Sequence, residues 1–235
     1  MSFTLASGKL PVWMLGGIDT DCMVGIHSIP VIADAALKGF IDMEEAYDCI
    51  RIFPTQPIEG LEYIDSLGYI PADKVNWSVS RALEYCIDDD AIARLAEALG
   101  KDEEAAYFRN RSKLYSQYFD GEFMRGKLSN GAFREPFNPS FALHEEADFV
   151  EGNSWQYTWL VPHDVEEMIC LHGGKDKFAA HLDGLFSASS ELNEGASVDI
   201  TGMIGQYSHG NEPSHHIVYF YTMAGKPWKT ADLVR

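Results

Sequence analysis

The densest group of reactive side chains lies between His209 and His216, which read His-Gly-Asn-Glu-Pro-Ser-His-His. This run combines imidazoles with a carboxylate, a carboxamide and a hydroxyl, and its glycine and proline constrain the backbone. A helix start would use Asn211 as N-cap with Glu212 and Pro213 in the first turn, but it would not also need the histidines. Polar clusters at a turn-to-helix junction usually bind or catalyse, so we interpret this segment as part of a functional site.

A second segment, residues 148–164, places a carboxylate ahead of several aromatic rings. Glu151 precedes Trp155, Tyr157 and Trp159. The apolar face of a pyranose stacks on such rings while polar side chains bond its hydroxyls, so this combination is typical of a sugar site. The alternative is an amphipathic helix with its aromatics in a core, and we expect the rings to divide between core and site. Glu151 precedes the helix and is the stronger site candidate.

Longer motifs extend both segments. They are Glu-Gly-Asn-Ser-Trp-Gln-Tyr-Thr-Trp from Glu151, Val-Pro-His-Asp from Val161, Ile-Gly-Gln-Tyr-Ser-His-Gly-Asn-Glu-Pro-Ser-His-His from Ile204 and Gly-Lys-Pro-Trp-Lys-Thr from Gly225. With Thr-Asp-Cys-Met-Val-Gly-Ile-His from Thr20, they resemble the family 92 glycoside hydrolases over nearly the whole chain. The resemblance implies a calcium-dependent, inverting, exo-acting α-mannosidase that hydrolyses α-linked mannose from glycans such as N-glycans or mannans. The implied partner is a mannose-containing oligosaccharide.

The resemblance assigns the catalytic acid to Glu151. Inverting hydrolysis needs an acid that protonates the leaving oxygen and a carboxylate on the opposite face that activates water. The alternative for Glu151 is a carboxylate attracted to a helix N-terminus, whose dipole would lower its pKa. An acid instead needs its pKa raised by burial or by a neighbouring carboxylate such as Asp148. The resemblance also implies that members cleaving mannosyl phosphodiesters carry Gln at this position, so Glu151 favours ordinary glycosidic bonds.

Asn211 and Glu212 are the expected metal ligands. Carboxamide and carboxylate oxygens are hard ligands that Ca²⁺ prefers. The nearby histidines would suit zinc, but the carbonyl-rich setting and the resemblance favour calcium. We expect the ion to hold the 2- and 3-hydroxyls of mannose and to orient the attacking water.

Contacts with the sugar are expected from four side chains: Trp155, Gln156, His209 and His215. The resemblance gives the residues around His209 a role in linkage preference, and Ser208 stands where α-1,2 enzymes carry Trp, so the linkage stays open. Of His215 and His216, one is expected to face the site and the other to pack in the core. Polar residues near the first long helix either line the pocket or serve as caps and core contacts: Asp21, His27 and Asp34.

Composition narrows the class of protein. The chain has 235 residues, a formal net charge of −18 and 46% hydrophobic residues. This charge argues against nucleic acid and anionic membrane surfaces as partners, and no apolar run reaches transmembrane length, so no membrane insertion is expected. The four cysteines are far apart, which argues against a zinc site or a disulfide framework and predicts small buried hydrophobes.

Apolar spacing predicts helices separated by loops rich in Gly, Pro and Asp. The predicted ranges are 24–40, 43–52, 76–86, 91–99, 102–118, 154–171 with an interruption at Pro162, 176–186 and 213–223. Strand alternation is confined to 123–128. The fold class is therefore all-α, and the resemblance implies an incomplete (α/α)6 toroid, roughly two thirds of the barrel.

The resemblance also sets expectations about the parent protein. Residues 1–235 would be a partial catalytic domain, lacking the N-terminal β-sandwich and the C-terminal part of the barrel with its catalytic base. The chain alone would then be inactive, while its parent would be exported, periplasmic or extracellular. Two alternatives stay open at this point: a non-catalytic carbohydrate-binding fragment, and another (α/α)6 glycosidase such as a glucosidase. A bare interaction scaffold would not need the polar cluster.

Overall fold

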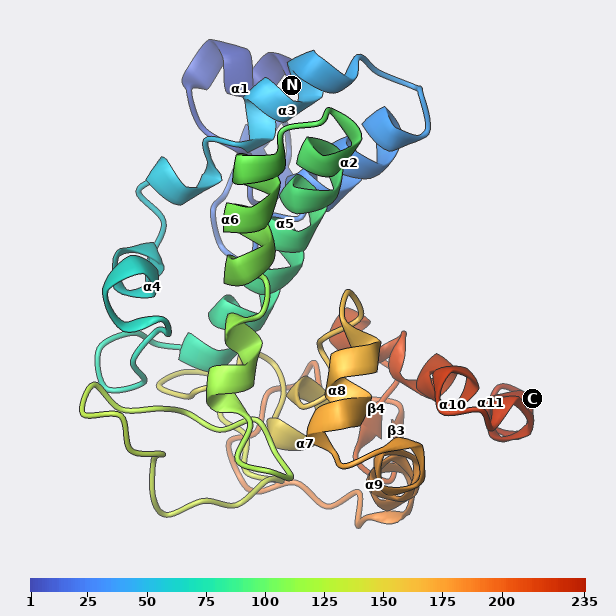
Figure 1. Cartoon of the computed structure of the whole chain (residues 1–235). Helices are drawn as coiled ribbons and strands as arrows, with labels where there is room; N and C mark the ends of the chain where they lie inside the picture. The colour runs from blue at the N-terminus through green and yellow to red at the C-terminus, as the bar shows by residue number, and fades with distance from the viewer. The chain divides into compact units, whose positions relative to one another are not determined.

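The computed structural model describes residues 1–235, apart from the side chain of Leu5, and the chain is mostly helical (Figure 1). It divides into two compact units. Unit 1 comprises Met1–Ile70 and Arg81–Gln117, and unit 2 comprises Pro71–Ser80 and Tyr118–Arg235. No helix in the described part of the chain is both long and apolar enough to cross a bilayer.

Unit 1 is built mainly from helices. They are α1 (Ser2–Ser7), α2 (Ser28–Leu37), α3 (Met43–Ile50), η1 (Phe53–Thr55), α4 (Leu61–Leu67), most of α5 (Ser78–Ala98), α6 (Asp102–Arg111) and most of η2 (Leu114–Tyr118). A short antiparallel hairpin joins β1 (Met14–Leu15) to β2 (Ile18–Asp19). α3 starts where the sequence predicts, because the Asp42 carboxylate accepts a hydrogen bond from the Glu45 amide and caps the helix.

The prediction of separate helices over 76–86 and 91–99 is wrong, because α5 runs unbroken through the acidic residues between them. These acids are buried and paired, not placed at a break in the helix. The Asp88 carboxylate accepts the Ile26 amide at 2.9 Å, and the Asp90 carboxylate pairs with Arg94 and Arg109. The helix therefore tolerates a run of carboxylates that would otherwise favour turns.

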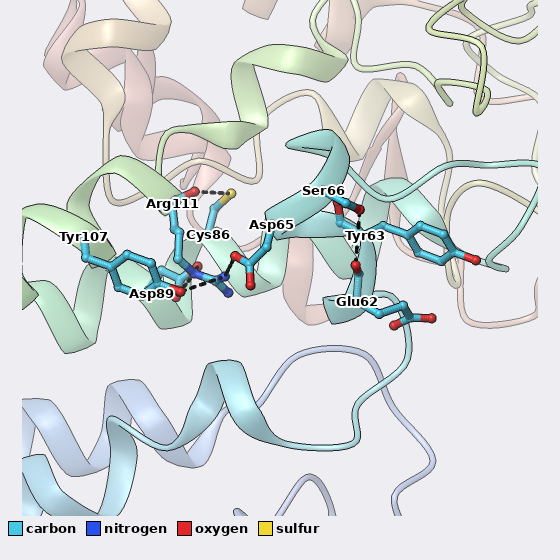
Figure 2. Close-up of polar contacts among 8 residues, drawn as sticks. All are labelled: Glu62, Tyr63, Asp65, Ser66, Cys86, Asp89, Tyr107 and Arg111. Atoms are coloured by element: carbon cyan, nitrogen blue, oxygen red, sulfur yellow. Dashed lines mark hydrogen bonds and ion pairs between the residues drawn. The ribbon is translucent and has the colours of Figure 1, made fainter.

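A buried guanidinium ties three helices of unit 1 together (Figure 2). Arg111 of α6 is 6% exposed, and its Nε lies 3.1 Å from each carboxylate oxygen of Asp89 on α5. One terminal nitrogen lies 3.2 Å from Asp65 on α4, and the Cys86 thiol donates to the Arg111 carbonyl. Since an uncompensated buried charge is costly, these contacts make the mutual placement of α4, α5 and α6 specific.

Unit 2 carries shorter elements. They are α7 (Ser154–Tyr157), α8 (Val165–Leu171), α9 (Lys175–Ser187), β3 (Met203–Ile204), β4 (Tyr207–Ser208), η3 (Glu212–Ser214), η4 (Ile217–Tyr219), α10 (Phe220–Met223) and α11 (Pro227–Leu233). The interruption expected at Pro162 is confirmed, since α7 and α8 are separate helices. The helix expected over 213–223 is broken into short pieces. α11 was not among the predicted helices, although Pro227 in its first turn is a start signal.

An aromatic cluster forms part of the core of unit 2. Trp159 is 1% exposed and stacks on His172 with ring centroids 5.3 Å apart, while Phe178 meets its edge. His172 Nε2 lies 3.2 Å from His181 Nδ1, and burial lowers the pKa of His181 to about 4. Trp159 is therefore a core residue and not a sugar platform.

The prediction that the cysteines are buried is right for two of the four. All four thiols are free, and Cys49 and Cys86 are buried as expected, but Cys22 and Cys170 are exposed.

Candidate active site

The loop before α7 holds Glu151 in an unusual backbone conformation. Its φ is +48°, in the left-handed region that residues with a side chain rarely adopt, and such conformations cluster at functional sites. Gly152 follows, and a Cβ there would lie 2.7 Å from the Tyr157 ring. Asn153 then caps α7: its side chain accepts the Trp155 amide, while its own amide donates to Gln156 Oε1 at 2.7 Å.

The loop around Asn211 meets this Glu151 loop. The Asn211 side-chain nitrogen donates to the Glu151 carbonyl and to Glu151 Oε2, each at 3.2 Å. This contact places residue 151 beside Asn211, and their membership of one functional site stays a prediction. Because the two segments are 60 positions apart, only the tertiary fold brings them together.

Buried amides fix the approach of the two loops. Gln206, which has no exposed surface, accepts the Asn153 side-chain nitrogen at 2.9 Å on its Oε1. The Gln206 carbonyl accepts Gln156 Nε2 at 2.5 Å. α7 also packs against β4 and η3, which carry the histidine-rich segment. A satisfied buried polar network of this kind defines one arrangement of the loops, because each broken bond would leave a desolvated group.

Asn211 and Glu212 differ in exposure. The Asn211 side chain is buried and its Oδ1 accepts the Glu212 amide at 3.1 Å, so it is the N-cap of η3 as predicted. The Glu212 side chain is exposed. The Asn211 carboxamide and the Glu212 carboxylate belong to adjacent residues, and the half-buried Glu151 carboxylate is hydrogen-bonded to the Asn211 side chain.

These side chains offer the kind of ligand expected for Ca²⁺, but they are too few to fill its coordination shell. Their ligand atoms are all oxygens, which Ca²⁺ prefers, but the ion takes six to eight of them. Within the residues that the structure describes, no group of three or more His, Cys, Asp or Glu side chains is arranged to hold a metal. Backbone carbonyls, water and sugar hydroxyls would have to complete the set.

The Asp148 carboxylate, close to Glu151 in the chain, is paired with a cationic side chain. Both its oxygens lie 3.1 Å from Arg134 Nε. Burial raises the pKa of Asp148, while the Arg134 guanidinium acts in the opposite direction. The negative charge of Asp148 is thus already paired within unit 2.

The histidines divide as expected. His209 and His215 are exposed, their ring centroids are 5.1 Å apart, and His215 Nε2 lies 2.9 Å from the His209 carbonyl. His209 Nδ1 also lies 2.9 Å from the Tyr207 hydroxyl. His216 instead packs inward, with Nε2 2.7 Å from the Trp159 carbonyl, and burial lowers its pKa. Two imidazoles therefore remain available at the surface of the site.

Trp155 and Gln156 form part of the frame of the site. The half-buried Trp155 ring meets Phe123 edge-on at 4.7 Å, and its Nε1 donates to the Ser140 hydroxyl at 3.2 Å. Gln156 is 2% exposed, and both ends of its amide bond the loops described above. Their contacts with sugar stay predictions.

The three polar residues near the first long helix belong to unit 1. The Asp34 carboxylate pairs with Lys38 at 2.7 Å on the surface of α2. His27 Nδ1 lies 3.8 Å from Glu84, and Asp21 is exposed with φ +50°. Asp34 thus has an ordinary surface role.

Sequence reasoning missed the framing amides and the Arg134–Asp148 pair. The Asn-x-x-Gln spacing of Asn153 and Gln156 is a capping-box signal that was available. No local signal joins Arg134 to Asp148.

Comparison with known proteins adds an independent observation. The model of the glycosyl hydrolase family 92 catalytic domain matches residues 2–235. The chain belongs to this family. The family resemblance read from the motifs is therefore confirmed.

Solved structures of family 92 members share the fold of this chain. An α-mannosidase of Bacteroides thetaiotaomicron in complex with mannoimidazole is 38% identical with a TM-score of 0.88, over 95% of this chain and 31% of that protein. An inverting mannosidase of the same bacterium is 32% identical with a TM-score of 0.83, over 97% of this chain and 33% of that protein.

A fungal sequence is also similar. The uncharacterized secreted glycosidase of Arthroderma benhamiae is 27% identical over 242 residues, which is 86% of this chain and 29% of that protein. This family 92 chain thus spans about 29–33% of the length of these relatives.

Proposed function

We propose that this family 92 chain is part of an exo-acting α-mannosidase that releases mannose from the ends of glycans with inversion. The observation that carries the proposal is the contact of Asn211 with Glu151 in one framed loop pair. The relatives named above as mannosidases support the choice of sugar. The helices would form part of an (α/α)6 toroid, and the fungal relative named as secreted supports an exported protein.

Glu151 is the general acid in this proposal. Asn211 holds one carboxyl oxygen, Oε2, and thereby leaves Oε1 to deliver a proton to the leaving oxygen. The exposed rings of His209 and His215 lie on the neighbouring loop, where they would bond hydroxyls of the bound sugar. Trp155 and Gln156 would shape the pocket around it.

Ca²⁺ is the cofactor in this proposal. Asn211 and Glu212 would hold it, and the bound ion would polarise sugar hydroxyls and the attacking water. We assign no described carboxylate as the base that activates water, so the 235-residue chain is expected to bind mannosides without turnover.

The test of Glu151 compares leaving groups in an active protein that contains this chain. The Glu151→Gln variant should lose about 10²–10⁴-fold in kcat/KM with alkyl or sugar mannosides, because general acids contribute that much when the departing oxygen is basic. It should lose far less with an activated aryl mannoside. The exposed Glu167 on α8 supplies the control, Glu167→Gln, which should leave both rates unchanged. Equal losses on both substrates would remove Glu151 from the acid role.

A further inference from the structure

Backbone strain is concentrated around one loop contact in unit 2. Of the four residues other than glycine with positive φ in the described chain, three lie there. Their φ values are +54° at Trp77, +54° at Glu146 and +48° at Glu151. Such conformations are costly and persist only where the surroundings determine the backbone. The position of the segment between Glu146 and Glu151, residues 147–150, is therefore imposed by its contacts.

The start of α5 and the two residues before it supply these contacts within unit 2. The Trp77 amide donates to the Ala147 carbonyl at 2.7 Å, and the Ala147 amide donates to Asn76 Oδ1 at 2.9 Å. The Asp148 carbonyl accepts the Val79 amide at 3.0 Å. The first amides of a helix have no partner inside it, so the loop satisfies one of them while the helix holds the loop.

Both polar groups of the Val150 backbone, the last before Glu151, are bonded to buried side chains. The Val150 amide donates to Ser80 Oγ at 2.9 Å, and Ser80 has no exposed surface. The Val150 carbonyl accepts the Tyr157 hydroxyl at 2.7 Å, and Tyr157 is 1% exposed. Without these partners the buried groups would be left desolvated, so the chain that enters Glu151 has one favoured position.

The other side of Glu151 is held as well. The Asn211 side-chain nitrogen donates to the Glu151 carbonyl and to Glu151 Oε2, each at 3.2 Å. The backbone of Glu151 is thus fixed both before and after its Cα. A general acid must lie within hydrogen-bond reach of the oxygen that it protonates, and a misplacement of about 1 Å can cost about 10²-fold in rate.

We propose that Ser80 and Tyr157 are positioning residues for the acid Glu151. Through the two polar groups of Val150 they maintain the left-handed backbone at Glu151, and thereby the distance from its carboxyl group to the leaving oxygen. Neither side chain touches the sugar in this proposal. The inference rests on the proposed function for the role of Glu151 as acid, whereas the hold on its loop does not depend on that role.

Kinetics of an active protein that contains this chain test the positioning role. Ser80→Ala should lower kcat roughly 10–10²-fold with alkyl or sugar mannosides, at nearly unchanged KM. It should lose far less with an activated aryl mannoside, whose departure needs little protonation. Ser80→Thr keeps the hydroxyl and should restore most of the rate. The matched control is Ser78→Ala, since the Ser78 hydroxyl is buried and has no hydrogen-bond partner among the described residues.

A double-mutant comparison separates positioning from a general loss of folded protein. If Ser80 acts through Glu151, Ser80→Ala should cost nothing further in a Glu151→Gln background. Tyr157→Phe removes only the other hydroxyl and should show the same preference for activated substrates, so it carries the test if Ser80→Ala does not fold. Equal losses on both substrates, or losses that add to those of Glu151→Gln, would overturn the proposal.

Amide hydrogen exchange on the 235-residue chain measures the hold on the loop without any activity. Exchange over residues 147–151 should be roughly tenfold faster in Ser80→Ala than in Ser78→Ala, the change expected for one lost hydrogen bond. Unchanged exchange would also overturn the proposal. The proposed function fails separately, through equal losses on both substrates in Glu151→Gln. Faster exchange in Ser80→Ala would then still establish Ser80 as a residue that holds the Glu151 loop.

Discussion

Asn211 links the two loops of the candidate site through one side chain. Its side-chain nitrogen donates to both the backbone carbonyl and the carboxylate of Glu151, while its side-chain oxygen caps η3. A single buried carboxamide therefore sets the orientation of the proposed acid and the start of the segment that carries Glu212. At the scale of single residues, we therefore expect Asn211 to couple the stability of the fold to the chemistry of the proposed site.

Replacing Asn211 tests this coupling. Asn211→Ala should lower the free energy of unfolding by about 1–3 kcal/mol, because buried partners lose their hydrogen bonds. It should also weaken mannoside binding, measured by calorimetry. Asn130, whose side chain bonds only the amide of Ala132 in an exposed turn, supplies the control Asn130→Ala, expected to cost little in both measurements. Equal effects of the two variants would contradict a linking role.

Glu84 on α5 predicts an unusual pH dependence of stability. Burial raises its pKa from 4.5 to about 8. The folded state therefore binds a proton that the unfolded state releases, so this stabilisation is complete below about pH 4.5 and is lost as pH rises towards 8.

The Glu84→Gln variant isolates that effect. Its free energy of unfolding should match that of the unmodified chain near pH 5 and exceed it on the order of 3 kcal/mol at pH 8, because glutamine never ionises. Urea unfolding at both pH values measures the difference. The exposed Glu103→Gln is the control and should show no pH-dependent gain. A loss of stability at pH 8 would show that the Glu84 charge is favourable, through His27 at 3.8 Å.

At the scale of elements, the β3–β4 hairpin docks on the end of α9 through its turn. The Gln206 backbone amide donates to the Leu185 carbonyl at 2.8 Å. Gly205, with φ +60°, lies so close that a Cβ would clash with the backbone of Leu185 and Phe186. This close approach brings Gln206 to the amides of the Glu151 loop.

Alanine variants at two glycines with positive φ compare the cost of backbone strain alone with the cost of strain plus a steric clash. Gly131→Ala, at φ +86° with open space around it, should cost only the strain of about 1–2 kcal/mol. Gly205→Ala should cost clearly more, since the hairpin must also move away from α9, and it should weaken mannoside binding. Chemical denaturation and calorimetry provide the two measurements. Similar losses in both variants would mean that the docking is not tight.

At the scale of the whole molecule, the charge of −18 attracts any divalent cation, so a calcium effect must be separated from simple screening. The exposed Glu212 offers a substitution that should not disturb packing. Specific binding to the native state stabilises it by about 2.7 kcal/mol at one hundred times Kd, whereas screening is shared by all variants.

Thermal unfolding in 0.15 M salt should therefore distinguish the two effects (about 8 Å screening length). Ca²⁺ should raise the Tm of the unmodified chain more than Mg²⁺ does, and chelation should reverse the gain. Glu212→Gln should lose this selective shift, while the exposed Glu194→Gln should keep it. The same calcium shift in all three proteins would exclude Glu212 as a ligand.

Local sequence was sufficient where structure depends on neighbours in the chain. Short spacings along the chain set helix caps and breaks, so three features were predictable: the cap at Asp42, the break between α7 and α8, and the Asn211 N-cap. The motifs also predicted the family correctly. Motif chemistry also pointed to Glu151 and Asn211, whose side chains are hydrogen-bonded in the structure.

Only the tertiary structure decided the features that join distant residues. α5 is continuous because Ile26 and Arg109 satisfy acids that local rules assign to a break. Trp159 belongs to the core because His172 stacks on it, and the Asp148 carboxylate is paired because Arg134 reaches it beside Gly126. A side chain's burial and pairing depend on groups that folding brings near, and spacing along the chain does not encode which groups those are.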